Sequence, residues 1–216
     1  MDREPRPPVR QEKRALRRLI RLAESNSEWA LGYEDETWWS RFEQPSLHSW
    51  AEAGEPMRLL QQEAKKDDPD PKALSCYGLY LPELHRTWLR FVDGRPVSAI
   101  TTQFLSWGLK KLEAMGKKAL LLIWDNASWH KSKFVKEWIA DHNREVKERG
   151  SGVRIVACFL PKKSPWLNAI EPKWIHGKRK VVELGEPLTA HELADRACEV
   201  FGCAHEPHLS IPQEVA

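Results

Sequence analysis

The 216-residue sequence has few cysteines, no long apolar run and little net charge. Its four cysteines are scattered, and Cys158 lies inside an apolar run, which predicts reduced thiols rather than a disulfide framework. No apolar run approaches membrane-spanning length and the N-terminus has no signal-peptide core, so neither secretion nor membrane insertion is expected. The net charge of +3 is too small to identify a partner. We see no internal repeat, and the length suits one domain with appendages.

The positive charge is concentrated at the N-terminus. Residues 1–22 hold eight Lys or Arg against three acids. Residues 1–8 contain three prolines and should be disordered, and apolar residues at helical spacing over 11–23 predict a short basic amphipathic helix. We treat residues 1–27 as a basic arm, which either contacts phosphate backbones or is a solvated terminal helix.

Strand and helix patterns alternate through the rest of the chain. The expected order is a strand ending at the acids of 34–36, irregular structure over 38–55, two antiparallel strands within 74–81 and 84–92, a helix over 101–115, a strand over 119–124, a helix over 132–149, a strand over 153–160, a helix from near Asn168, and a last helix capped by Thr189 and Glu192. This order predicts an α/β fold with a mixed five-stranded sheet flanked by helices. The domain would cover residues 28–204, followed by a loose tail at 205–216.

The chain is organised around an apolar run at 119–124 that stops abruptly at Asp125. Such a run is typical of a strand buried on both faces that delivers a side chain at its carboxyl end. In a mixed sheet the strand ending near Asp35 can lie beside this one, and the helix carrying Glu171 can begin over the same edge. Three converging carboxylates usually hold divalent metal, and oxygen ligands favour Mg²⁺ or Mn²⁺. Two such ions are the arrangement that nucleases use for phosphodiester chemistry. For any single acid, a capping or turn role is the alternative.

A second group of polar residues lies near the C-terminus, at Cys198, Cys203, His205 and His208. Their spacing fits no common zinc site, and Cys198 falls inside a helical pattern. We therefore predict no zinc site from them.

Two motifs carry a specific resemblance. The segment 122–130, Leu-Ile-Trp-Asp-Asn-Ala-Ser-Trp-His, is followed by 160–174, Leu-Pro-Lys-Lys-Ser-Pro-Trp-Leu-Asn-Ala-Ile-Glu-Pro-Lys-Trp. Together they resemble the DDE transposases of bacterial insertion sequences related to the mariner elements. Asp35-Glu36 and the segment 50–56 are similar to that family's first-acid region. The resemblance covers roughly residues 28–182, with Ala169 standing where the family usually has proline.

The resemblance implies a ribonuclease-H-like fold and a catalytic site in which Asp35, Asp125 and Glu171 bind two Mg²⁺ or Mn²⁺ ions. It also implies hydrolysis of a phosphodiester at the transposon end, followed by attack of the released 3′-hydroxyl on target DNA. Asn126 and His130 match motif positions that either orient the metal site or contact DNA, although His130 alone could equally cap a helix or pack. Asn168 either supports the site or caps the helix that presents Glu171.

Further residues near the third acid are candidates for DNA contacts. A basic track would comprise Lys162, Lys163, Lys173, Lys178, Arg179 and Lys180, with a solvated helix face as the alternative. Trp166 stands in a loop, where it could stack on a distorted base.

The expected partners are double-stranded DNA, as transposon ends and target, and a second copy of the chain in an active homodimer; no membrane partner is expected. The family ordinarily carries helix-turn-helix modules before the catalytic domain, and only the arm precedes it in this sequence, so a separate helix-turn-helix subunit is a further candidate partner. The expected location is the cytoplasm, at the bacterial nucleoid. A catalytically inactive DNA-binding remnant and a nuclease acting on RNA–DNA hybrids are the two alternatives, the second less favoured by the motif around Glu171.

Overall fold

The computed structural model of the chain describes residues 7–42, 67–162, 164–181 and 188–211. The segment 50–56, predicted to belong to the first-acid region, and Lys163 lie outside these residues, as does most of the segment 38–55 that was expected to be irregular.

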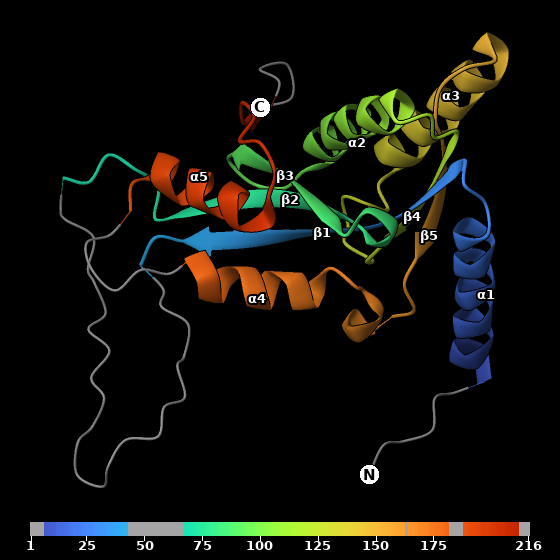
Figure 1. Cartoon of the computed structure of the whole chain (residues 1–216), viewed down its shortest axis with the longest axis horizontal. Helices are drawn as coiled ribbons and strands as arrows, with labels where there is room; N and C mark the ends of the chain where they lie inside the picture. Colours follow the sequence, from blue (N-terminus) through green and yellow to red (C-terminus); the bar gives the residue numbers. More distant parts are fainter. Residues whose placement is uncertain (1–6, 43–66, 163, 182–187, 212–216) are drawn as a thin grey trace, which may run out of the picture.

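One sheet forms the centre of the fold (Figure 1). Its strands lie in the order β5-β4-β1-β2-β3-β6. They are β1 (Trp29–Ser40), β2 (Ala73–Leu81), β3 (Arg86–Asp93), β4 (Ala119–Trp124), β5 (Arg154–Phe159) and β6 (Leu209–Ser210). β2 is antiparallel to β1 and β3, whereas β4 is parallel to β1 and β5. The predicted α/β class and mixed sheet are therefore confirmed.

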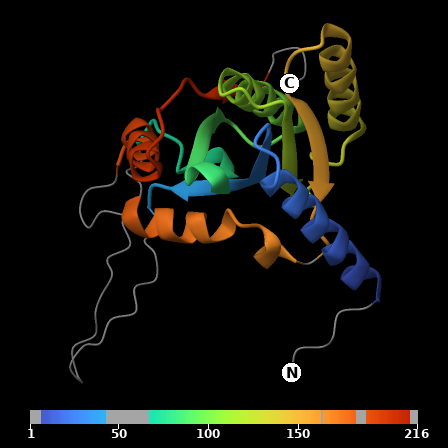
Figure 2. The same cartoon turned by 45° about the vertical axis from the view of Figure 1, so that its right-hand side comes forward.

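Helices cover both faces of this sheet. They are α1 (Pro7–Glu24), α2 (Ser98–Ala114), α3 (Lys133–Arg149), α4 (Glu171–Val181) and α5 (Ala190–Phe201), with short 3₁₀ turns at Pro82–Leu84 and Pro165–Leu167. Side chains of α1, α4 and α5 share one core cluster, on what we call the α4 face, and side chains of α2 and α3 share the other, on the α2 face. Figure 2 shows α4 and α2 on opposite sides of the strands.

Strand β4 explains how one apolar run serves both clusters. All six of its residues are buried. Leu121 and Ile123 belong to the cluster on the α4 face, and Leu120, Leu122 and Trp124 belong to the cluster on the α2 face. Because strand side chains alternate between faces, a strand covered on both sides needs apolar residues at every position.

Four details differ from the sequence predictions. β1 does not end at the acids of 34–36 but continues to Ser40, so these acids lie within the strand. The first helix begins at Pro7, where proline is tolerated because the first helical amides have no partner within the helix. α4 begins at Glu171, after a 3₁₀ turn, rather than near Asn168.

The fourth difference concerns the tail. The sheet has six strands rather than five, because Leu209 and Ser210 pair with β3 in a parallel arrangement. The tail predicted to be loose from His205 is thus attached to the sheet edge over these residues. Two residues are too short a strand to leave a readable pattern in the sequence.

Two further predictions concern the cysteines and membrane-spanning helices. All four cysteines are free thiols, as predicted. Among the helices of 7–42, 67–162, 164–181 and 188–211, none is long and apolar enough to cross a membrane.

Candidate functional site

Three consecutive acids in the middle of β1 divide between the two faces of the sheet. Tyr33 belongs to the core cluster on the α4 face. By strand alternation Asp35 shares that face, whereas Glu34 and Glu36 point toward the α2 face. The contacts described below agree with this division. The three neighbours in sequence therefore belong to two different environments.

Asp125 stands beside Asp35 at the end of the neighbouring strand. In the parallel register of β1 and β4, Tyr33 is the partner of Ile123. Asp35 lies two residues further along β1 and Asp125 directly follows the last residue of β4, so continued strand alternation would put the two acids on the same face. β4 ends at Trp124, and the Asp125 Oδ1 atom accepts a hydrogen bond of 2.8 Å from the backbone amide of Ala127. This local turn exposes half of the Asp125 side chain at the strand end.

Helix α4 brings the third acid to the same place. Glu171 is its first residue, and Trp174, on nearly the same side of the helix, donates from Nε1 to Asp35 Oδ2 at 3.2 Å. Close approach is possible because Gly78 is the cross-strand partner of Asp35. A Cβ atom at Gly78 would lie 2.3 Å from Cη2 of Trp174, so any larger residue would push the helix away.

The charges of the carboxylates influence one another's pKa. Burial, the charge of Glu171 and the charge of Glu36 raise the pKa of Asp35 from 3.8 to about 7, against the hydrogen bond from Trp174. Burial and the charge of Asp125 raise the pKa of Glu171, and Lys178 partly opposes this. Repulsion of this kind is what a bound divalent cation relieves. The donor set, three carboxylates and no thiol or imidazole, fits Mg²⁺ or Mn²⁺.

His130 forms a hydrogen bond with Asp125. Its Nδ1 atom lies 2.9 Å from Asp125 Oδ1, and its ring stacks on Trp124 with the centroids 4.6 Å apart. Burial alone would raise the pKa of Asp125, but the hydrogen bonds from His130 and the Ala127 amide, with the positive charge of His130, bring it below its usual value. Asp125 is thus held as an anion, whereas the pKa of about 7 leaves Asp35 partly protonated near neutral pH.

The opposite edge of the same imidazole contacts the two acids of the α2 face. The His130 Nε2 atom lies 3.0 Å from Glu36 Oε1 and 3.2 Å from Glu34 Oε2, and His130 and Glu34 are fully buried. Trp129 Nε1 also donates to Glu36 Oε1, at 2.8 Å. Burial would lower the pKa of His130, but the charge of Glu34 and the bonds to Asp125 and Glu36 raise it to about 11.

The Glu34–Glu36–His130 group has two chemical uses, as a set of metal ligands or as a buried ion pair. Its ligand atoms are close enough together to suit a metal ion. A metal-binding imidazole must, however, be neutral. In the metal-free chain the raised pKa of His130 makes it the cation of the group, and burial and the charge of Glu36 raise the pKa of Glu34, so that one positive charge faces fewer negative charges.

Sequence reasoning did not assign Glu34 and Glu36 to the site. The signal was present, because acids on both sides of Asp35 within a strand must point to its other face. It was overlooked because β1 was expected to end at these residues, where acids are ordinary.

Two asparagines of the motifs fasten loops at the site. The Asn126 side chain donates from Nδ2 to the carbonyl of Leu160 at 2.6 Å, which joins the loops after β4 and β5. Asn168 is buried, and its side chain donates from Nδ2 to the backbone carbonyl of Glu34 at 3.1 Å. The backbone carbonyl of Asn168 accepts a hydrogen bond from the backbone amide of Glu171. Asn168 therefore connects the start of α4 to β1 beside Asp35.

The predicted DNA-contacting residues that the structure describes differ in exposure and in contacts. Lys162, Arg179 and Lys180 are exposed, and Lys178 is near enough to lower the pKa of Glu171. Lys173 instead lies over the ring of Tyr80, 4.6 Å from its centroid. Trp166 is 68% exposed, and Lys13 of α1 lies 5.6 Å from its ring centroid.

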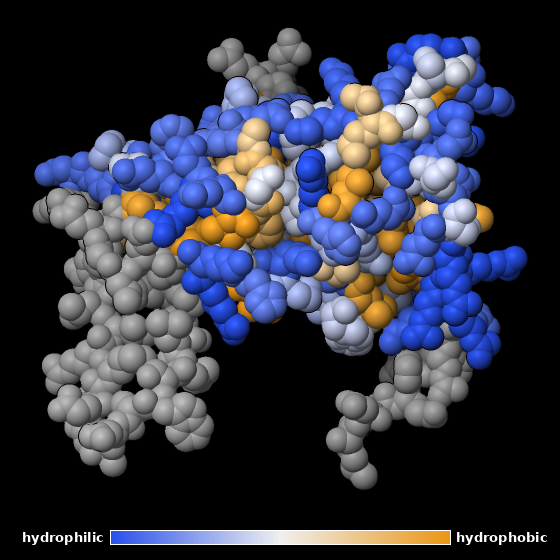
Figure 3. All heavy atoms as spheres, viewed as in Figure 1, coloured by the Kyte–Doolittle hydropathy of each residue, from blue (hydrophilic) through white to orange (hydrophobic). Residues whose placement is uncertain are grey.

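Helix α1 packs on the α4 face of the sheet. Leu16 and Ala23 are buried in the cluster on the α4 face. The arginines of the helix are exposed on its outer side, at positions 14, 17, 18 and 21. Figure 3 shows the hydrophilic surface over α1 at the right of the view. Within the basic arm, helix α1 thus packs against the domain and presents the arginines at 14, 17, 18 and 21 to solvent.

Comparison with known proteins gives a family match. The model of the family described as DDE superfamily endonuclease matches residues 31–193, which include all three acids. No curated protein sequence is similar enough to this chain to count as a match.

Solved structures resemble the chain in fold. The Mos1 transposase paired-end complex with left transposon end has a TM-score of 0.59 at 14% identity, covering 94% of this chain and 57% of that one. The Mos1 strand transfer complex has a TM-score of 0.57 at 13% identity, covering 94% of this chain and 59% of that one. The Mos1 mariner paired end complex with Mn has a TM-score of 0.58 at 14% identity, covering 93% of this chain and 56% of that one. This chain therefore spans less than two thirds of the length of these proteins, and the predicted ribonuclease-H-like fold is confirmed.

Proposed function

This chain belongs to the DDE superfamily endonuclease family, and on that basis we propose that it is a transposase catalytic domain that cuts DNA and transfers the cut strand. More narrowly, we place it among the mariner-related transposases of bacterial insertion sequences. The observation that carries the proposal is the meeting of Asp35, Asp125 and α4 on one face of the sheet, with Trp174 bonded to Asp35.

The reaction has two steps. In the first, water attacks a phosphorus atom at the element's end and the 3′-oxygen leaves as a 3′-hydroxyl. In the second, this hydroxyl attacks a phosphorus atom of the target, forms the new phosphodiester and displaces a target 3′-oxygen. Asp35, Asp125 and Glu171 would hold two divalent cations, Mg²⁺ or Mn²⁺, which supply Lewis-acid activation of the attacking oxygen and neutralise charge on the phosphate.

The surrounding residues orient these acids. His130 fixes Asp125 through Nδ1 and is itself fixed by Glu36 through Nε2. Asn168 and Trp174 connect the first turn of α4 to β1. Such supporting partners hold ligands in the geometry that the chemistry needs.

The substrate is double-stranded DNA. Two of the similar structures carry titles of a transposon-end complex and a strand transfer complex. In this chain the exposed Lys162, Arg179 and Lys180, with the arginines of α1, supply positive charge for the phosphate backbone, and Trp166 an exposed ring for stacking. Pairing of two ends would require a homodimer, and a separate helix-turn-helix subunit would recognise the end sequence. The site of action would be the bacterial nucleoid.

A nicking assay tests the proposal. The purified chain is incubated with supercoiled plasmid in Mg²⁺ or Mn²⁺, and the appearance of nicked circles is measured. We expect metal-dependent nicking that Asp125→Ala reduces by about 10²-fold or more. Glu137→Ala, at an exposed acid of α3, should cut as the parent does. Equal nicking by Asp125→Ala and the parent would refute the assignment.

A calorimetric titration with Mn²⁺ separates an enzyme from an inactive DNA-binding remnant. The proposed site should bind Mn²⁺, and Asp125→Ala should lose that binding. A parent chain that binds DNA but no Mn²⁺ at millimolar concentration would favour the remnant.

A further inference from the structure

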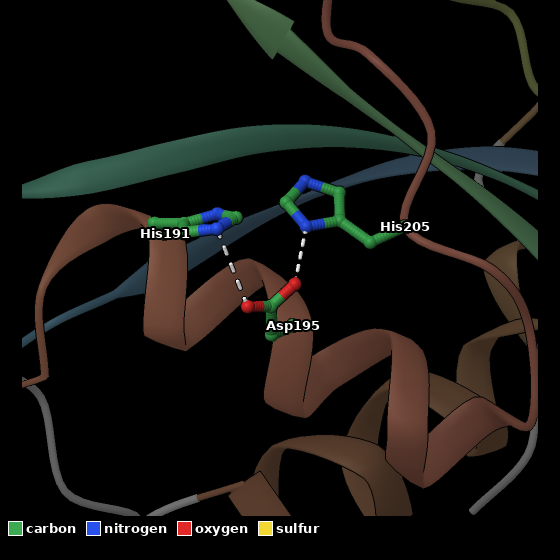
Figure 4. Close-up of side chains that lie close together, drawn as sticks. All are labelled: His191, Asp195 and His205. Atoms are coloured by element: carbon green, nitrogen blue, oxygen red, sulfur yellow. Dashed lines mark hydrogen bonds and ion pairs between the residues drawn. The ribbon is translucent and has the colours of Figure 1, made fainter.

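A separate group of metal-binding side chains lies on α5 and the segment after it. His191 and Asp195 are one turn apart on the helix, and His205 approaches them from the following segment (Figure 4). One ligand atom from each residue lies within 4.8 Å of the others. The group shares no residue with the three acids of the candidate active site.

The three side chains already point at one another. His205 Nδ1 lies 2.5 Å from Asp195 Oδ1, and His191 Nε2 lies 3.5 Å from Asp195 Oδ2. The side chains of His191 and Asp195 are 77% and 53% exposed. An ion at usual zinc distances of about 2.0–2.2 Å would therefore need only small rotations of exposed side chains.

His205 is held in place by its surroundings. Its side chain is only 16% exposed. Its ring packs edge-on against Phe91 of β3, with the centroids 5.8 Å apart, and the pairing of β6 with β3 fixes the segment just beyond it. The ligand farthest in sequence is thus the one that the fold positions most firmly.

The contacts of the other ring nitrogen of His205, Nε2, favour a bound metal ion most strongly. Its Nε2 atom lies 3.2 Å from Nε2 of His208, whose Nδ1 atom lies 2.7 Å from Asp93 Oδ1. If Nδ1 of His205 binds an ion, the His205 proton is on Nε2 and is donated to His208. His208 then carries its proton on Nδ1 and donates it to Asp93. Every contact is satisfied with both imidazoles neutral.

Without an ion the same chain of contacts needs one more proton. If each Nδ1–H donates to its carboxylate, the two Nε2 atoms face each other as acceptors. Their hydrogen bond then requires a doubly protonated imidazole. A metal-bound histidine, by contrast, commonly donates its other N–H to a partner that ends on a carboxylate.

We propose that His191, Asp195 and His205 form a binding site for Zn²⁺ or a chemically similar divalent transition-metal ion, with solvent as the remaining ligand. Two imidazole nitrogens and one carboxylate suit zinc, whereas the three carboxylates of the candidate active site suit Mg²⁺. The ion would tie the segment around His205 to α5. The site does not depend on the proposed transposase activity.

The cysteines nearby in sequence are not ligands of this site. Cys198 is buried in the core cluster on the α4 face, and Cys203 packs against that cluster, where its free thiol shares a hydrogen bond with that of Cys198. Of the four residues considered from spacing alone, only His205 belongs to the group.

Calorimetry and thermal unfolding test the site. The chelator-treated chain is titrated with Zn²⁺ in millimolar Mg²⁺, which occupies the carboxylate site. We expect one Zn²⁺ per chain and a rise in Tm, since an ion that binds only the folded state stabilises it. His191→Ala, at an exposed position, should fold normally, lower Zn²⁺ affinity by about tenfold or more, and abolish the rise in Tm.

Two control variants make the result specific. His176→Ala removes an exposed histidine of α4 and should bind Zn²⁺ as the parent does. Asp125→Ala should also keep the Zn²⁺ site, so failure of the transposase assignment and failure of this site give different results. Absence of Zn²⁺ binding in the parent, or equal Zn²⁺ affinity in His191→Ala, would overturn the proposal.

Discussion

The indole Nε1 of Trp174 donates a hydrogen bond of 3.2 Å to Oδ2 of Asp35, across 139 positions of sequence. This bond joins α4 to β1 at the place where Glu171 begins the helix. It also stabilises the charged form of an otherwise buried carboxyl, since a donor favours the anion. The position of the third acid thus depends on a buried aromatic residue of α4.

Trp174→Phe should weaken both the fold and the site. The ring remains apolar, but the donor to Asp35 and part of the packed volume are lost, at about 1–2 kcal/mol of unfolding free energy. Metal-dependent nicking should fall more than for Trp39→Phe, which removes the same volume from the same core cluster without taking a donor from Asp35. Denaturant unfolding and the nicking assay check this. Equal nicking by the two variants would show that the bond does not position the site.

His130→Gln should lower metal affinity. His130 supplies the positive charge and hydrogen bond that hold Asp125 as an anion, and losing such a partner costs about 10–100-fold in metal affinity. Titration with Mn²⁺ measures the change. The matched control is His142→Gln, whose imidazole also stacks on a tryptophan, Trp138, but bonds to the carbonyl of Val153. If both variants bind Mn²⁺ like the parent, His130 has only a packing role.

Asp35→Asn should stabilise the metal-free chain, increasingly as pH rises. The folded chain holds the Asp35 proton up to a pKa of about 7, whereas the unfolded chain releases it near 4. Between these values the unfolded state binds fewer protons, so this carboxyl makes the free energy of unfolding fall as pH rises. Asparagine has no such proton, and its advantage should grow to at most the order of 4 kcal/mol by pH 7. Denaturant unfolding in chelator from pH 4 to pH 8 measures it, and a difference that does not vary with pH would contradict the burial of this carboxyl.

Gly78→Ala should destabilise the chain. The new methyl would lie 2.3 Å from Cη2 of Trp174 and 2.9 Å from Cδ1 of Ile170, so α4 must shift, at about 1–3 kcal/mol. Gly108→Ala is the control, because its methyl would meet only Leu79 at 3.7 Å and alanine favours a helix by about 1 kcal/mol. Thermal unfolding should therefore move in opposite directions for the two variants. A lowered Tm in both would point to a general intolerance of added volume.

Much of the fold could be predicted because its signals are local. Apolar periodicity marked the helices and strands, and the capping box of Thr189 and Glu192 is present at the start of α5. The errors lay where the signal was weak or ambiguous. β1 was ended too early because acids normally end strands, and the two residues of β6 were missed because their pairing depends on a distant strand edge.

The candidate site divides in the same way. The sequence by itself determined that Asp125 follows a fully buried strand and that Glu171 belongs to a polar motif near a helix start, because both depend on neighbours a few positions away. Only the tertiary structure decided which faces the acids occupy, how His130 bridges Asp125 to Glu36, and that His191, Asp195 and His205 meet. Strand register and helix packing bring together residues that are far apart in the chain, and one position of register would turn every acid of β1 to the other face.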